Sequence, residues 1–290
     1  MTETTGSSAE NPPEAEQPEA VAEPAAEDTA AEDSTADDSS PGDRKRTTLR
    51  ESAILVSIAL VLYYLMLTFV ARPYLIPSES MEPTLHGCHG CVGDRIMVDK
   101  VTYRFSSPQP GDVVVFRGPP SWNVGYKSIR SDNTAVRWVQ NALSFIGFVP
   151  PDENDLVKRV IAVGGQTVQC RNDTGLTVDG KVLDEPYLDP ATLMVDPMVY
   201  PCLGNEFGPV TVPEDRLWVM GDNRTHSSDS RAHCDTVAIQ PDLQHRILCT
   251  GDDVNAGTVP VDNVIGKTRF IAWPPSRWGL VRAINPQQGP

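Results

Sequence analysis

The segment Ile76-Pro-Ser-Glu-Ser-Met-Glu-Pro-Thr-Leu85 begins a few residues after the one long apolar run of the chain. It places two serines, Ser78 and Ser80, close to the membrane that such a run would span. Pro77 and Pro83 disfavour helix and leave a stiff, extended segment that can hold a hydroxyl in one place. A serine hydroxyl is a poor nucleophile at neutral pH, so catalysis would need a base elsewhere and donors for an oxyanion. The alternative is a membrane-exit linker, in which serine and proline are ordinary residues.

The apolar run covers residues 53–71 and carries no charge over its 19 positions, close to the length of a helix that spans a bilayer. We predict one transmembrane helix over residues 51–72 at the plasma membrane. The basic residues that precede it place the N-terminus in the cytoplasm and the rest of the chain outside; they are Arg44, Lys45, Arg46 and Arg50. A cleavable signal peptide is the alternative, but its apolar part would be too long.

The first 43 residues contain 13 acidic residues and no Lys or Arg. Such a segment has too few apolar side chains to offset chain entropy. We therefore expect residues 1–50 to be a disordered cytoplasmic tail that ends in the basic cluster. Without those acids the net charge falls from −15 to about −2, so the acidic composition indicates nothing about the substrate. A nucleic-acid partner is not expected, because no basic face is apparent.

Residues 73–290 contain short β-branched runs between Gly, Pro and Asp breaks, a pattern that predicts strands. The runs are Arg95–Val98, Asp112–Phe116, Val157–Val163, Thr167–Gln169, Leu217–Met220 and Val264–Ala272. Strands do not alternate with long helices, so a parallel sheet is not indicated. The predicted fold class is mostly β, with an antiparallel β-rich domain tethered by one N-terminal transmembrane helix.

Two regions interrupt the strand pattern. In the insertion 119–152, apolar residues recur at helical spacing after several basic residues, which predicts an amphipathic helix on anionic lipid or a surface helix docked on the sheet. The apolar residues are Val139, Ala142, Leu143 and Ile146. Residues 170–213 are rich in Asp, Pro and Gly, and we expect an inserted subdomain there. Trp273 and Trp278 are either packing residues or lipid anchors.

All six cysteines lie in the outward part, which favours disulfides. Six cysteines allow 15 pairings, although Cys170 with Cys202 and Cys234 with Cys249 would close loops of reasonable length. The segment His86-Gly-Cys-His-Gly-Cys91 is similar to a metal knuckle, but it lacks a second ligand cluster at finger spacing, so a disulfide or free thiols are favoured over zinc.

Lys158 is the best candidate for the base. It lies on the apolar strand Leu156–Val163, where alternation should send Lys158 and Arg159 to opposite faces, so one of them points inward. Burial lowers the pKa of a lysine, whereas an arginine stays charged. The alternative is that both residues flank a solvent-exposed strand. None of the five histidines has a sequence context typical of a histidine-based serine hydrolase.

A third segment, Met220-Gly-Asp-Asn-Arg-Thr-His-Ser-Ser-Asp-Ser-Arg231, is crowded with polar groups just after a strand. Such a loop can supply a hydroxyl that orients an amine, and carboxylate-guanidinium pairs that keep the loop rigid. Alone, it could be a polar turn.

Four motifs in this order after a membrane anchor resemble bacterial type I signal peptidases. They are Pro-Ser-x-Ser-Met-x-Pro-Thr-Leu, Pro-Gly-Asp-Val-Val-Val-Phe, Lys-Arg-Val-Ile and Gly-Asp-Asn-Arg-x-x-Ser-x-Asp-Ser-Arg. The resemblance extends from Ile76 to Arg231, and Trp273–Gly279 is similar to the end of the family's domain. It does not cover the acidic tail, residues 119–152 or residues 170–213.

The resemblance implies a Ser-Lys dyad, in which Ser80 is the nucleophile and Lys158 the general base. Ser78 would stabilise the oxyanion with the Ser80 N–H, and Ser227 would hold the lysine amine. The residues that would brace the site are Asp222, Asp229, Arg231 and Arg159, and those that would contact substrate are Met81 and Pro83. No metal or cofactor is implied.

The implied substrates are exported preproteins delivered by the secretion machinery, cut after small residues in an Ala-x-Ala pattern. Membrane lipid is the other implied partner, and we expect a monomer. One departure is Ala162-Val-Gly-Gly-Gln166, where the family usually has Gly-x-Pro-Gly-Asp; it affects a turn and not the dyad. Two alternatives remain, a Ser-Lys protease with a different substrate and a non-catalytic β-domain that binds exported proteins.

Overall fold

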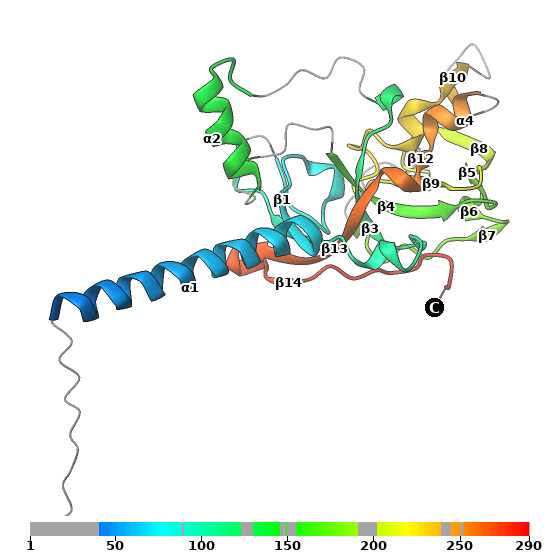
Figure 1. Cartoon of the computed structure of the whole chain (residues 1–290). Helices are drawn as coiled ribbons and strands as arrows, with labels where there is room; N and C mark the ends of the chain where they lie inside the picture. Colours follow the sequence, from blue (N-terminus) through cyan, green and yellow to red (C-terminus); the bar gives the residue numbers. More distant parts are fainter. Residues whose placement is uncertain are drawn as a thin grey trace, which may run out of the picture. The chain divides into compact units, whose positions relative to one another are not determined.

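The computed structural model describes residues 41–88, 90–122, 130–145, 149, 155–190, 202–238, 245–249 and 252–289. The chain divides into two compact units, Met1–Ser52 and Ala53–Pro290. The β-rich architecture lies in the second unit (Figure 1).

One long helix, α1, covers Pro41–Phe69, and its part Thr48–Phe69 is long and apolar enough to cross a membrane. The helix therefore begins inside the stretch that we expected to be disordered, because Pro41 suits a first helical position and Arg and Lys are good helix formers. It also ends before residue 72. Strand β1, Ala71–Leu75, begins two residues after the helix ends and pairs with β2, Arg95–Asp99. The chain therefore enters the first sheet directly after the helix.

The first sheet has eight strands in the order β1-β2-β13-β3-β4-β9-β12, with β14 paired to β13. Its pairings are antiparallel. The remaining bounds are β3 Val113–Arg117, β4 Asp155–Val163, β9 Arg216–Met220, β12 Val259–Pro260, β13 Val264–Trp273 and β14 Gly279–Leu280. The sheet contains five of the six predicted strands, and the antiparallel β-rich class is confirmed.

The second sheet has six strands in the order β10-β11-β8-β5-β6-β7. Its members are β5 Thr167–Arg171, β6 Gly175–Val178, β7 Lys181–Val182, β8 Glu206–Thr211, β10 Asp235–Ala238 and β11 His245–Leu248. The described parts of the region 170–213 supply β6, β7 and β8 to this sheet, which also includes β5. β6 and β7 are only four and two residues long, and β8 is interrupted by Gly208 and Pro209, so none of them shows a run of alternation in the sequence. The β8–β11 pair is parallel.

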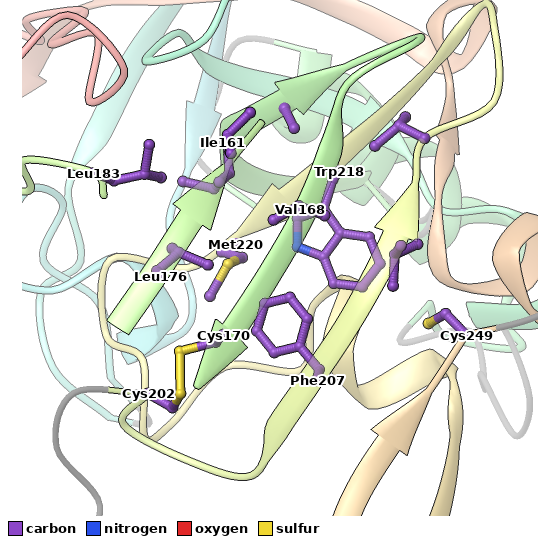
Figure 2. Close-up of a cluster of buried hydrophobic side chains, with 14 residues drawn as sticks. Ile161, Val168, Cys170, Leu176, Leu183, Cys202, Phe207, Trp218, Met220 and Cys249 are labelled. Carbon is purple, nitrogen blue, oxygen red and sulfur yellow. A yellow bond between two sulfur atoms is a disulfide. The ribbon is translucent and has the colours of Figure 1, made fainter. Parts of the chain in front are cut away.

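The largest buried cluster joins the two sheets (Figure 2). Trp218 of β9 is fully buried and stacks on Phe207 of β8, with ring centroids 5.3 Å apart. Val168, Val178 and Val210 of the second sheet pack against Ile161 and Met220 of the first. The hydrophobic effect thus holds the sheets face to face and makes β4 and β9 interior strands.

Helix α2, Thr134–Phe145, lies in the predicted insertion. The remaining helical turns are η1 Glu79–Met81, η2 Thr102–Arg104, η3 Pro120–Trp122, η4 Ser230–His233, α4 Asp252–Gly257, η5 Val261–Asn263 and η6 Pro275–Arg277. Ile146 of the predicted helical stripe lies outside the described residues.

The six cysteines form three disulfides, Cys88–Cys91, Cys170–Cys202 and Cys234–Cys249. The Cys170–Cys202 bridge borders the main core (Figure 2). His86 lies close to the first bridge, with potential ligand atoms of these three residues within 4.8 Å. The two sulfur atoms in this group, those of Cys88 and Cys91, are already bonded to each other in the disulfide.

Candidate active site

Ser80 lies on the short turn η1, and its hydroxyl meets the lysine of the apolar strand. Lys158 Nζ donates a hydrogen bond of 2.6 Å to Ser80 Oγ, and both side chains are buried. The turn is anchored to the core, because Met81 and Leu85 are completely buried in a cluster with Ile96 and Val98. Met81 is thus a core side chain in this structure, whereas Pro83 is exposed.

Both members of the Lys158–Arg159 pair are buried, at 3% and 1% exposure. β4 lies between β3 and β9 and contributes Ile161 and Val160 to two different core clusters, so both of its faces are packed. One of the pair was expected to point inward; both are buried, and the alternative of a solvent-exposed strand does not apply. Burial is the main cause that lowers the pKa of Lys158, to about 8, although Asp229 and Asp222 oppose this shift.

Arg159 and Asp222 form a buried bidentate ion pair. Arg159 donates from Nε to Asp222 Oδ1 at 2.8 Å and from Nη2 to Oδ2 at 2.7 Å. A third donor, Nη1, bonds to the Gly111 carbonyl at 2.9 Å, and the guanidinium lies 4.0 Å from the ring centre of Tyr187. Thr84 Oγ1 also donates to Asp222. These contacts connect β4, the polar loop and the chain that follows the serine turn.

Asp229 and Arg231 form a second buried pair within the polar loop. Arg231 donates to both carboxylate oxygens, at 2.9 and 2.8 Å, and the Gly221 N–H donates to Asp229 at 3.0 Å. Burial opposes ionisation of Asp229, but the charge and hydrogen bonds of Arg231 outweigh it and lower the pKa to about 2. The loop therefore holds an ionised carboxylate near Lys158.

The polar loop is attached directly to the serine turn through Asn223. The Asn223 N–H donates to the Ser80 carbonyl at 3.1 Å, and its side-chain amide donates to the Glu79 carbonyl at 3.2 Å. Gly221 has no room for a side chain, because a Cβ there would lie 2.4 Å from the Ser80 carbonyl oxygen and 2.3 Å from Ser227 Oγ. Our sequence reasoning did not single out Asn223 or Gly221, although both lie in the Gly-Asp-Asn part of the third motif.

The two supporting serines, Ser78 and Ser227, differ in their exposure to solvent. Ser78 Oγ lies 3.3 Å from Ser80 Oγ, on the exposed side of the turn. Ser227 Oγ is buried and makes no hydrogen bond of normal geometry within the described chain, although it is close enough to Asp229 to help lower the pKa of that carboxyl. A contact between Ser227 and the Lys158 amine stays a prediction.

The sequence matches a family model described as signal peptidase, peptidase S26, over residues 49–273. The chain belongs to this signal peptidase family. It is 78% identical over 242 residues to a signal peptidase I of Mycobacterium tuberculosis, covering 83% of this chain and 78% of the relative. It is 74% identical over 239 residues to a probable signal peptidase I of Mycobacterium leprae, covering 82% and 81%.

A solved signal peptidase I from Enterococcus faecalis aligns with 56% of this chain and 97% of its own, at 23% identity and a TM-score of 0.32, too low to bear on the fold. The family match establishes a signal peptidase that is associated with membranes. The buried serine-lysine contact lies inside the matched range.

Proposed function

We propose that this signal peptidase cuts its substrates by acyl transfer, with Ser80 as nucleophile and Lys158 as general base. The observation that carries the proposal is the buried 2.6 Å hydrogen bond between Lys158 Nζ and Ser80 Oγ. A base must lie within hydrogen-bond reach of the proton that it removes and must be neutral when it acts. The lowered pKa of Lys158, about 8, supports a useful neutral fraction near neutral pH.

The reaction proceeds in two steps. Ser80 Oγ attacks the scissile carbonyl carbon while neutral Lys158 takes the hydroxyl proton, and the resulting ammonium returns that proton to the leaving amine as the C–N bond breaks. Water, deprotonated by Lys158, then releases the acyl group from Ser80. The oxyanion would be stabilised by the Ser80 N–H and the Ser78 hydroxyl, and the 3.3 Å separation of the two serine oxygens supports this role for Ser78.

The surrounding pairs act as positioning residues. Arg159 and Asp222 join the polar loop to β4, and Asp229 and Arg231 brace the loop internally, through buried hydrogen bonds. Ser227 would orient the lysine amine when substrate is bound. These groups keep the nucleophile and base within the narrow range of geometry that an efficient reaction needs.

The substrates we propose are exported preproteins whose signal peptides end in an Ala-x-Ala pattern, bound as an extended strand beside a sheet edge. Pro83 is an exposed candidate for contact with that strand. The helix α1 would span the membrane with its N-terminus in the cytoplasm and the β-domain, as a monomer, outside. The serine turn begins ten residues after α1 ends at Phe69, so the site would lie near the membrane surface where the cut site emerges.

The test is cleavage of a preprotein by the detergent-solubilised chain, comparing wild type with Ser80→Ala and Lys158→Met. We expect each substitution to lower kcat by at least ~10³-fold, since a nucleophile and its base act as a unit. Lys181→Met, at an exposed lysine on β7, is the matched control and should leave cleavage unchanged.

The pH profile separates the lysine from other bases. For wild type, kcat/KM should rise about tenfold per pH unit on the acid side and level off near pH 8, where the lowered pKa of Lys158 lies. Normal cleavage by a folded Lys158→Met variant would show that the base lies elsewhere. If wild type binds the preprotein without cutting it, the alternative of a non-catalytic binding domain holds.

A further inference from the structure

Helix α2 makes hydrogen bonds through its polar side chains to the segment just before it. Arg130, which is 9% exposed, donates from Nε to Asn141 Oδ1 at 3.0 Å, and the Ser131 N–H donates to Gln140 Oε1 at 3.0 Å. Ser144, on the same side of the helix one turn after Gln140, is 5% exposed. These hydrogen bonds and the buried Ser144 therefore belong to the polar side of the helix.

The apolar side of α2 faces outward. Val136, Val139 and Leu143 recur at helical spacing, and they are 46%, 49% and 37% exposed; Trp138 beside them is 72% exposed. A surface helix of a soluble domain normally turns its apolar stripe toward the core, so this helix has the reverse arrangement. Four exposed large apolar side chains on one short helix form a patch of the kind that marks an interaction surface.

The position of α2 connects this patch to the membrane segment. The helix contacts β1, and β1 begins two residues after α1 ends. The end of α1 is in turn joined to the domain, because Lys100 Nζ donates to the Thr68 carbonyl at 2.6 Å and Leu67 is buried. Strand β1 is five residues long, about 17 Å at the usual rise per residue, so α2 lies close to the point where α1 would leave the bilayer.

We propose that α2 is an interfacial helix whose exposed stripe, Val136, Trp138, Val139 and Leu143, inserts into the lipid surface of the membrane that α1 spans. The occupant is lipid because α2 contacts β1, the strand that begins two residues after the membrane helix α1 ends. Tryptophan is enriched at membrane interfaces, and the exposed Arg137 supplies attraction to anionic headgroups. The helix is then a second attachment that limits how far the site can swing from the bilayer. The proposal does not depend on the identity of the catalytic base.

The first test uses the full chain in vesicles of phosphatidylcholine with a minor share of phosphatidylglycerol. The emission of Trp138 is obtained as the difference between wild type and Trp138→Phe, which removes the contribution of the other tryptophans. We expect acyl chains brominated near the headgroup to quench more than half of this emission, and aqueous acrylamide to quench little of it. Quenching by acrylamide alone places the helix in water and overturns the proposal. Shielding from both quenchers places it against protein, a second copy or a partner, and also overturns it.

The second test compares Val139→Glu/Leu143→Glu with Val182→Glu, a matched control at a valine that is 64% exposed on β7. The double variant should lose the quenching of Trp138 by brominated lipid, whereas the control keeps it. Cleavage of a vesicle-embedded preprotein should fall several-fold in the double variant, while cleavage of a short peptide in detergent stays at the wild-type rate, which also shows that the variant is folded. Unchanged lipid quenching in the double variant contradicts the proposal whatever happens to cleavage.

Discussion

At the scale of single residues, the pKa of Lys158 depends on how the charges of two nearby carboxylates are neutralised by arginines. Asp229 and Asp222 both favour the charged form of Lys158, yet each is held by its own arginine, Arg231 or Arg159. Their attraction for the lysine is therefore reduced, and burial determines the sign of the pKa shift. A single uncompensated carboxylate at this place would keep the lysine protonated and unable to act as a base.

The lowered pKa of Lys158 makes stability depend on pH. The pKa is about 8 in the folded chain and 10.5 in the unfolded chain, so the unfolded state binds more protons between these values and stability rises with pH across that window. For this nearly buried group the rise is up to ~3 kcal/mol. Unfolding by urea at several pH values should show the rise as the difference between wild type and Lys158→Met. A difference that stays constant from pH 7 to about 10.5 would mean that the lysine pKa is not lowered.

The buried pair Arg159–Asp222 gives a second prediction. Arg159→Met leaves a buried carboxylate without its main partner and should destabilise the fold by about 3–5 kcal/mol. The double variant Arg159→Met/Asp222→Leu removes both charges and should recover much of that loss. Urea unfolding of wild type, Arg159→Met, Asp222→Leu and the double variant measures the coupling. If the double variant is as unstable as the sum of its single variants, the two side chains act independently.

At the scale of elements, the site is an assembly of three segments that the sheet brings together. Strand β4 carries the lysine, η1 carries the serine, and the loop after β9 connects them through Asn223. Because β4 pairs with both β3 and β9, the lysine and the loop are placed by the same ladder. Backbone contacts thus fix the segments from which the serine and the lysine reach each other.

Gly221 is the position in this assembly at which we expect even a methyl group to disturb the site. In Gly221→Ala, the new methyl group would collide with the Ser80 carbonyl and with Ser227, so the serine turn has to shift. We expect a loss of about 10²-fold in kcat/KM, the scale expected for a displacement near 1 Å.

Gly279→Ala is the control for this prediction, since its methyl group would meet only one atom, at 3.9 Å. Kinetics with a fluorogenic Ala-x-Ala peptide compare the two variants. Wild-type activity of Gly221→Ala would show that the turn can yield without moving the nucleophile.

At the scale of the whole molecule, the first strand of the β-domain, β1, begins two residues after the candidate membrane helix α1 ends. Residues Ala71, Arg72 and Pro73 pair with Asp99, Val98 and Met97, immediately after the end of α1. A protein cut at the predicted end of the transmembrane helix would therefore lose part of its first sheet. Helix α2 contacts this same strand.

The position of β1 predicts how truncation affects stability. A chain that starts at Tyr74 lacks three β1 pairs and the bond from Lys100 to Thr68, so it should be less stable by about 2–3 kcal/mol than one that starts at Leu67. Its Tm should be lower by about 4–12 °C, measured by calorimetry in the same detergent. A chain that starts at Pro41 and lacks only the acidic tail should match the full chain. Equal Tm values for the Leu67 and Tyr74 chains would mean that β1 contributes no stability.

The sequence by itself determined those elements whose pattern lies within a short stretch of consecutive residues. An uncharged run of spanning length predicted the helix, and β-branched segments between turn residues predicted five strands of the first sheet. The serine-lysine pair was implied by the family resemblance that the serine, lysine and loop motifs carry in their order. The same patterns could not indicate the short strands of the second sheet, since β6 and β7 are held by neighbours and not by their own periodicity.

Only the tertiary structure decided which faces are covered. The sequence places Lys158 and Arg159 on opposite faces, but the packing of both faces of β4 buries them together and so lowers the pKa of the lysine. The spacing of α2 predicts an amphipathic helix, but not which of its sides is left exposed. For Lys158 and Arg159 the cause is the burial produced by segments far away in the chain, and a pattern of nearest neighbours contains no information about those segments.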